Sequence, residues 1–166
     1  MKLLYLLSLL IITSCQKKLK QNDFEIVINK YDKTDFSFFK NTFIAIRERS
    51  RSEIIFIIGK SEDNLPVYFV NYSINKDRII EINKRALKEK NIEDYFSDNE
   101  INKLIVNFKK LDLSLLKVDK DGNVFINPFD INEPAVMLRL ENLSNKKEIR
   151  KGFVYSQYKN NWYIKK

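Results

Sequence analysis

One amphipathic segment, residues 97–111, separates two strand-rich parts of the sequence. It begins with Ser97 and Glu100, a capping-box pair in which the serine oxygen accepts a backbone N–H and the glutamate reaches back to the cap. An apolar stripe follows at helical spacing, formed by Ile101, Leu104, Ile105, Phe108 and Leu111. Lys109 and Lys110 stand at the negative end of the helix dipole. The pattern predicts an amphipathic helix whose apolar face needs a partner surface.

Segments rich in β-branched and aromatic residues lie on both sides of this helix and predict strands. The expected strands are 24–28, 53–60, 66–73, 78–84, 113–118, 123–127, 135–141, 152–158 and 162–166. Between two of them, Asp121-Gly122 favours a type I′ hairpin turn, because both residues accept positive φ angles.

Two further segments favour helices. Four apolar residues in 36–46 recur at helical spacing, although the second half of that segment would also suit a strand. A weaker helical pattern covers 84–96. The order of strands, helices and strands predicts an α+β fold, with a mostly antiparallel sheet and two or three helices packed on one face.

The N-terminal segment has the layout of a secretory signal peptide. Lys2 gives a basic start, residues 3–12 form an apolar block interrupted by Ser8, and small residues precede Cys15. A membrane-spanning helix needs about 20 apolar residues, roughly twice the length of this block. We therefore predict a signal peptide over residues 1–14.

The sequence Ile12-Thr13-Ser14-Cys15 resembles the lipobox of bacterial lipoprotein precursors. In that family the cysteine thiol receives a diacylglyceryl group and the peptide is cut just before it, here between Ser14 and Cys15. The resemblance implies a lipid anchor on Cys15 and a place in the bacterial cell envelope, facing the periplasm or the cell surface. It implies nothing about the fold that follows. An ordinary signal peptide with a chance free cysteine, or a buried N-terminal helix, would be the alternatives.

Residues 15–22 are expected to form the lipidated cysteine and a polar tether. Lys17, Lys18 and Lys20 would lie beside phospholipid head groups, where each basic residue near an anionic surface contributes about 1 kcal/mol to binding. The solubility of a linker would explain the same lysines. The membrane is thus one expected partner.

Residues 23–166 are expected to form one globular domain. With 12 Phe, 8 Tyr and 1 Trp, the chain is too aromatic for a disordered protein. Cys15 is the only cysteine, so no disulfide can hold the domain together.

The net charge is +8, but the lysines are dispersed and the densest basic cluster, 47–53, also contains two glutamates. We therefore expect no nucleic-acid partner.

The chain contains no histidine, which excludes Ser-His-Asp and Cys-His catalysis and histidine zinc sites. Its three glycines, Gly59, Gly122 and Gly152, lie too far apart for a phosphate-binding loop. An enzyme would have to rely on groups such as a carboxylate pair. The acidic residues of 93–100 are expected to act as caps and solvated charges, so we predict no catalytic residue and no cofactor apart from the lipid.

Residues 119–130 have the spacing of oxygen ligands in a calcium-binding EF-hand loop. The residues at positions 1, 3, 5, 9 and 12 of this window are Asp119, Asp121, Asn123, Asn127 and Asp130. Val124 stands where that loop needs a glycine, and Asp130 replaces the usual bidentate glutamate. The flanks also favour strands. We therefore expect a hairpin rather than a metal site.

The aromatic C-terminal segment is the candidate surface for a protein partner. Strand alternation places Tyr158 on the face opposite Phe153 and Tyr155. Packing in a sheet core would explain these aromatic residues, whereas Tyr158 with Trp162 or Tyr163 could instead form an exposed aromatic patch.

Two functions fit these features. One is a lipid-anchored, non-enzymatic protein-binding module of the envelope, of an inhibitor, immunity or assembly type. The other is an envelope glycan-binding module or a carboxylate-based hydrolase. A carboxylate pair in a concave pocket lined by Tyr or Trp would favour the second function, and a flat aromatic patch without such a pocket would favour the first.

Overall fold

The computed structural model describes residues 20–61, 64–131, 133–142 and 155–166. The chain divides into two compact units, Met1–Asp32 and Lys33–Lys166. None of the helices in the described residues has both the length and the apolar character that crossing a membrane requires.

The described part of the first unit contains helix α1, Gln21–Tyr31. The backbone N–H of Lys20 donates to the Asp23 carboxylate at 2.9 Å, so an acidic residue caps the first turn. Val27, Ile28 and Tyr31 are buried and recur on one side of the helix. The predicted strand at 24–28 is therefore wrong, and residues 21 and 22, which were assigned to the tether, belong to this helix. The β-branched residues indicated a strand, but this preference is weak beside a capped helix with a one-sided apolar face.

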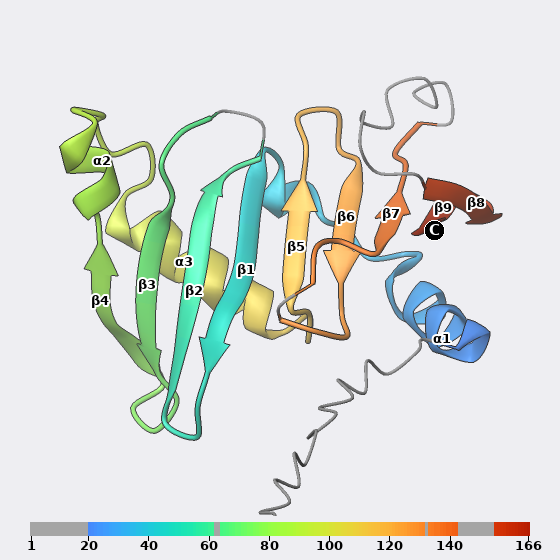
Figure 1. Ribbon diagram of the computed structural model, residues 1–166, viewed down its shortest axis with the longest axis horizontal. Helices are drawn as coiled ribbons and strands as arrows, with labels where there is room; N and C mark the ends of the chain where they lie inside the picture. Colours follow the sequence, from blue (N-terminus) through green and yellow to red (C-terminus); the bar gives the residue numbers. More distant parts are fainter. Residues whose placement is uncertain (1–19, 62–63, 132, 143–154) are drawn as a thin grey trace, which may run out of the picture. The chain divides into compact units, whose positions relative to one another are not determined.

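The second unit contains a nine-stranded antiparallel sheet in its described residues (Figure 1). Its strands are β1 (Thr42–Arg49), β2 (Glu53–Lys60), β3 (Tyr68–Ser73), β4 (Arg78–Asn83), β5 (Leu115–Val118), β6 (Val124–Asn127), β7 (Met137–Arg139), β8 (Tyr155–Lys159) and β9 (Trp162–Lys165). They lie in the order β4-β3-β2-β1-β5-β6-β7-β9-β8, so β4 and β8 are the edges of an open sheet. The predicted α+β fold is confirmed.

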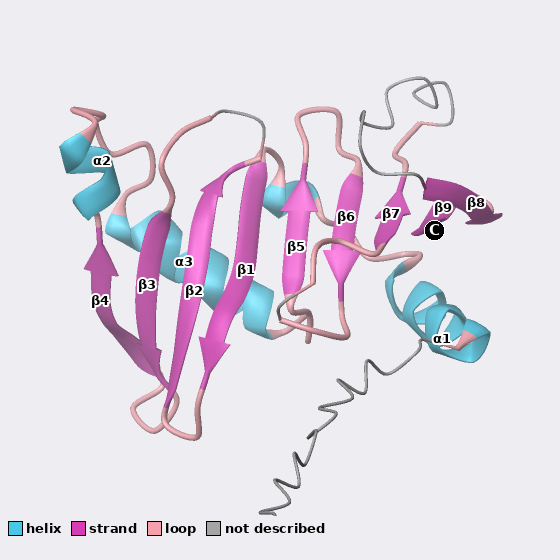
Figure 2. Ribbon diagram, viewed as in Figure 1, coloured by secondary structure: helices cyan, strands magenta, loops and turns pink. Residues whose placement is uncertain are grey.

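Helix α3, Asp98–Lys109, is the helix expected at 97–111. Its capping box is formed as predicted: the Glu100 N–H donates to Ser97 Oγ at 3.2 Å, and the Ser97 N–H donates to the Glu100 carboxylate at 2.7 Å. In Figure 2, α3 crosses behind strands β1–β3. The rings of Phe108 and Phe56 meet edge to face at 6.1 Å, which shows that the apolar stripe of α3 packs on this face of the sheet.

The other two helical expectations are corrected. Residues 42–49 form strand β1, preceded by a short 3₁₀ helix, η1 (Ser37–Phe39). The expected helix at 84–96 is reduced to α2, Arg85–Glu89. Strand β1 is hydrogen-bonded on both sides, to β2 and β5, and these pairings outweigh the helical spacing of its apolar residues.

The turn between β5 and β6 also differs from the expected type I′ turn. Within this turn, only Gly122 has a positive φ, +89°. The Gly122 N–H donates to the Asp119 carbonyl at 3.2 Å, and the Asp119 N–H donates to the Asn123 carbonyl at 3.0 Å. The chain therefore makes a three-residue hairpin loop, in which a glycine in the left-handed region follows an ordinary turn.

Candidate functional site: the open face of the sheet

The face of the sheet opposite α3 carries large apolar side chains that are only half-buried. These side chains, here called the open face, are Phe43, Ile55, Ile57, Phe69, Leu115 and Phe125. They alternate with buried residues that point toward α3, as in β2, where Ile54, Phe56 and Ile58 are buried. Within the described part of residues 33–166, no helix lies on the open face (Figure 2).

Strand register arranges all of the open face except Ile55 in two rows across the sheet. In one row, Phe69 pairs with Ile57, Ile57 with Ala45, and Ala45 with Leu115. In the other, Lys117 stands between Phe43 of β1 and Phe125 of β6. Because neighbouring strands are about 4.8 Å apart, the first row forms a nearly continuous apolar band, whereas Lys117 interrupts the second row.

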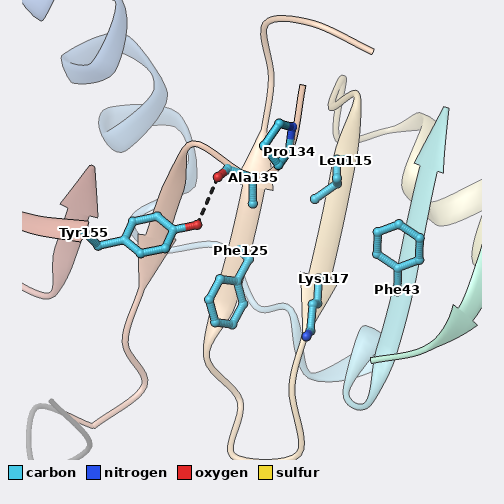
Figure 3. Close-up of a pocket in the computed structure, with 7 residues that line it drawn as sticks. All are labelled: Phe43, Leu115, Lys117, Phe125, Pro134, Ala135 and Tyr155. Atoms are coloured by element: carbon cyan, nitrogen blue, oxygen red, sulfur yellow. Dashed lines mark hydrogen bonds between the residues drawn. The ribbon is translucent and has the colours of Figure 1, made fainter. Parts of the chain in front are cut away.

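A cavity of about 190 Å³ opens beside the second row (Figure 3). Its lining consists of Phe43, Leu115, Lys117, Phe125, Pro134, Ala135 and Tyr155. The Tyr155 hydroxyl donates to the Ala135 carbonyl at 2.9 Å, which joins β8 to the loop between β6 and β7. The Tyr155 ring also meets the Phe125 ring at 6.4 Å. We call this cavity the apolar pocket.

A buried cluster supports the walls of the apolar pocket. Leu138, Leu140 and Tyr163 form this cluster, and the half-buried rings of Phe125 and Tyr155 pack against it. Side chains held in this way lose little further conformational freedom on binding, so the pocket is largely preorganised.

Two basic side chains lie on aromatic rings of the open face. The Lys117 ammonium is 5.5 Å from the centre of the Phe125 ring, and the Arg47 guanidinium is 5.8 Å from that of Phe69. Arg47 also approaches Glu48 at 3.9 Å. Such cation–π contacts position positive charge directly above apolar surface.

A second cavity of about 330 Å³ is more polar. Its polar side chains are Arg49, Lys109, Asp112 and Ser114. It therefore contains one carboxylate, and the lining of the apolar pocket contains none. The carboxylate pair that glycoside hydrolysis requires is absent from both cavities in the described residues.

Lys109 belongs to a polar cluster with Tyr72 and Asp77. Its ammonium donates to Asp77 at 2.6 Å and also bonds the Tyr72 hydroxyl, which in turn bonds Asp77. Burial would lower the pKa of Lys109, but the hydrogen bonds to Asp77 and Tyr72 outweigh it and raise that pKa. Burial, followed by the Asp77 hydrogen bond, raises the pKa of Tyr72. All three groups hold their ordinary charge at neutral pH, which suits a structural cluster better than acid–base catalysis.

The acidic residues near α3 also form ion pairs or hydrogen bonds. Lys84 contacts Asp94 and Asp98 at 2.7 Å each, and these two hydrogen bonds raise the pKa of Lys84. The N–H of Ser97 lowers the pKa of Glu100. Asp94 and Asp98 therefore bind the Lys84 ammonium, and Glu100 caps helix α3.

Most of the residues predicted for lipidation and membrane contact lie outside the described residues. These are Ser14, Cys15, Lys17 and Lys18. Lys20 is described, and it is exposed at the start of α1.

The structure buries two members of the candidate aromatic patch. Trp162 is 0% exposed and Tyr163 is 4% exposed, whereas Tyr158 is half-buried. Strand β9 lies between β7 and β8, so both of its edges are paired. Trp162 lies beside Arg139 and Tyr163 pairs with Leu138. These two side chains therefore form no exposed patch with Tyr158.

The residues that have the spacing of calcium ligands stabilise two separate turns through hydrogen bonds. Asp119 accepts hydrogen bonds from the backbone N–H of Asp121 at 3.0 Å and of Asn123 at 2.8 Å. At the far end of β6, Asn127 donates to the carbonyls of Glu133 and Pro134 at 3.0 Å each. Asn127 also accepts from the backbone N–H of Asp130 at 3.2 Å. In the described residues, no group of three or more acidic or cysteine side chains is arranged to hold a metal ion.

No family model, curated protein or solved structure matches this chain. Its candidate site therefore depends on the geometry of the open face and its pocket. Sequence reasoning missed these residues because each one looks like an ordinary strand residue. Residues 124–126, for example, read Val-Phe-Ile, and an apolar run does not tell which of its side chains a helix will cover.

Proposed function

We propose that the chain is a lipid-anchored protein of the bacterial envelope that binds another protein, without catalysis, through its open face. The observation that carries this proposal is the group of half-buried apolar side chains over β1, β2, β3, β5 and β6, with a preformed pocket beside it. Contiguous exposed apolar surface commonly marks a site of protein interaction.

The arrangement has the anatomy of a binding hot spot. Phe43, Phe125 and Tyr155 provide aromatic walls, and Lys117 supplies charge at the same place. Aromatic residues grouped around a central pocket account for much of the binding energy in many interfaces, and a polar rim excludes water around them. The absence of a carboxylate pair from the two cavities makes the alternative of a hydrolase less favoured.

The lipid anchor is supported by the sequence of residues 1–15 alone. An anchor on Cys15 would restrict the protein to a membrane surface, where a partner in or near that membrane is encountered at high effective concentration. An interface of modest area would then be enough to keep the partner bound.

Site-specific photo-cross-linking of the full-length protein in its native host tests the proposal. A photoreactive phenylalanine derivative replaces Ile55 or Phe69 on the open face, and Val106 in a matched control. Val106 is 43% exposed on α3 and so lies on the other side of the sheet. We expect discrete protein adducts from Ile55 and Phe69 and none of these adducts from Val106. Equal adducts from all three positions, or none from the open face, would contradict the proposed surface.

A further inference from the structure

The second cavity has the size of a small-molecule site. It measures about 330 Å³. Sites that enclose a ligand usually measure about 300–1,000 Å³, and a cavity of about 150 Å³ is enough to hold a benzene molecule. Five of its lining side chains are apolar and buried: Ile46, Ile54, Phe56, Phe108 and Leu113. The cavity therefore accepts an apolar body of about two rings.

One wall of the second cavity is the segment that follows β6. Its lining residues there are Pro128, Phe129 and Ile131. The side-chain carbonyl of Asn127, which is 0% exposed, accepts the backbone N–H of Phe129 at 2.9 Å and that of Asp130 at 3.2 Å. These hydrogen bonds hold the wall in place before a ligand arrives, which lowers the entropic cost of binding.

A bulge in β1 determines which charged side chain lies on this side of the sheet. Ile46 and Arg49 both pair with buried residues of β2 that point toward α3. Between them the register shifts by one residue, at Arg47. In regular alternation Glu48 would share the face of Ile46. The bulge places Arg49 there instead, and bulges beside functional sites commonly redirect a side chain in this way.

Arg49 is the cation of the lining that remains available to a ligand. The Lys109 ammonium is already bound to Asp77 and to the Tyr72 hydroxyl. Arg49 is exposed, and its guanidinium forms no hydrogen bond or ion pair with any residue that the structure describes. A guanidinium binds a carboxylate through two parallel N–H···O bonds. Asp112 also belongs to the lining, and its charge disfavours a ligand with more than one negative charge.

We infer that the second cavity binds a small monocarboxylic acid. Its compact apolar body, about two rings in size, packs on the buried side chains, and its carboxylate bonds to Arg49. This site goes beyond the proposed function, because the second cavity lies on the α3 side of the sheet and shares no lining residue with the apolar pocket.

Two matched probes test the inference: 6-fluoronaphthalene-2-carboxylate and the corresponding neutral amide. Each is titrated into the full-length protein in micelles of an uncharged detergent and followed by ¹⁹F NMR, with empty micelles as the blank. We expect the acid to bind roughly three- to tenfold more tightly than the amide, because only the acid forms a charge-assisted pair.

Variants of Arg49 then assign the carboxylate. Arg49→Met should reduce the affinity for the acid to that for the amide and leave the amide unchanged. Arg49→Lys keeps the charge and should retain part of the preference. Arg51→Met is the matched control, because Arg51 is an exposed arginine in the same hairpin that does not line the cavity, and it should keep the full preference.

Variants of the aromatic walls locate the apolar body. Phe129→Ala should weaken binding of both probes, whereas Phe43→Ala, in the apolar pocket, should weaken neither. Ile131→Ala, in the same wall as Phe129, repeats the test if Phe129→Ala does not fold. Far-UV circular dichroism checks the fold of every variant.

Three results would overturn the inference. They are equal affinity for acid and amide, no binding of either probe, and an acid preference that survives Arg49→Met. Losses from Phe43→Ala without losses from Phe129→Ala or Ile131→Ala would also overturn it, because the probe would then occupy the apolar pocket.

Discussion

Arg139 shows how a single residue joins parts of the second unit that are far apart in the sequence. It is 8% exposed, and its guanidinium donates to the Thr34 carbonyl at 3.0 Å. The same group lies 5.0 Å from the centre of the Phe36 ring and 6.0 Å from that of Trp162. A buried guanidinium is tolerated here because its hydrogen bond and the two ring faces compensate for lost water.

Replacing this side chain tests that account. Arg139→Met keeps much of the apolar volume but leaves the Thr34 carbonyl without this donor and removes both cation–π contacts. We expect the free energy of unfolding to fall by about 2 kcal/mol, measured by urea denaturation.

Arg85→Met is the matched control for this substitution. Arg85 is 82% exposed and contacts Glu89 one helical turn away, a kind of pair that contributes about 0.3–0.5 kcal/mol. If Arg139→Met were no more destabilising than Arg85→Met, the contacts of Arg139 would not contribute to stability.

At the level of helices and strands, sequence predictions were correct where the signal involves the backbone directly. The capping box of α3 was predicted from Ser97 and Glu100, and both of its hydrogen bonds are formed. Strands β2, β3 and β4 lie within the segments predicted for them. Strand propensity failed at α1, where a strand-like sequence is helical, and helical spacing failed at β1, where apolar residues with that spacing form a strand. In both cases capping or strand pairing outweighs preferences of less than about 1 kcal/mol per residue.

The cap of α3 gives the prediction at this scale. Ser97→Ala removes the acceptor for the Glu100 N–H, so we expect a loss of about 1 kcal/mol in the free energy of unfolding. Ser97→Thr keeps a hydroxyl that can accept the same bond and should retain most of that stability. Thermal and urea denaturation of the two variants would measure the difference. Equal losses in both would mean that the serine oxygen is not the stabilising group.

At the scale of the whole molecule, the proposed function combines two features of different origin. The lipobox resemblance at Ile12–Cys15 concerns where the chain is held. The open face concerns what it can contact. Neither feature requires histidine or a disulfide, which agrees with a chain that has no histidine and a single cysteine.

Changing Cys15 tests the anchor without touching the open face. Cys15→Ser removes the thiol that would receive the lipid, so we expect unprocessed precursor or protein released from the membrane fraction. Fractionation of the native host, with intact-mass analysis of the mature chain, would measure this. A mature wild-type protein that begins at Cys15 without lipid would end the lipoprotein proposal.

The sequence alone was enough to predict the fold class and many, though not all, of the local elements. A capped amphipathic stripe and runs of β-branched residues carry their signals within a few positions, so α3 and most of the strands could be located before any contact was known. The tertiary structure alone decided which surfaces are covered. Strand order inserts β9 between β7 and β8, where Trp162 and Tyr163 are buried, and the position of α3 leaves Phe43 and Phe125 half-buried on the other face. The physical reason is that burial depends on neighbours brought together by long-range pairing, and alternation within one strand contains no information about those neighbours.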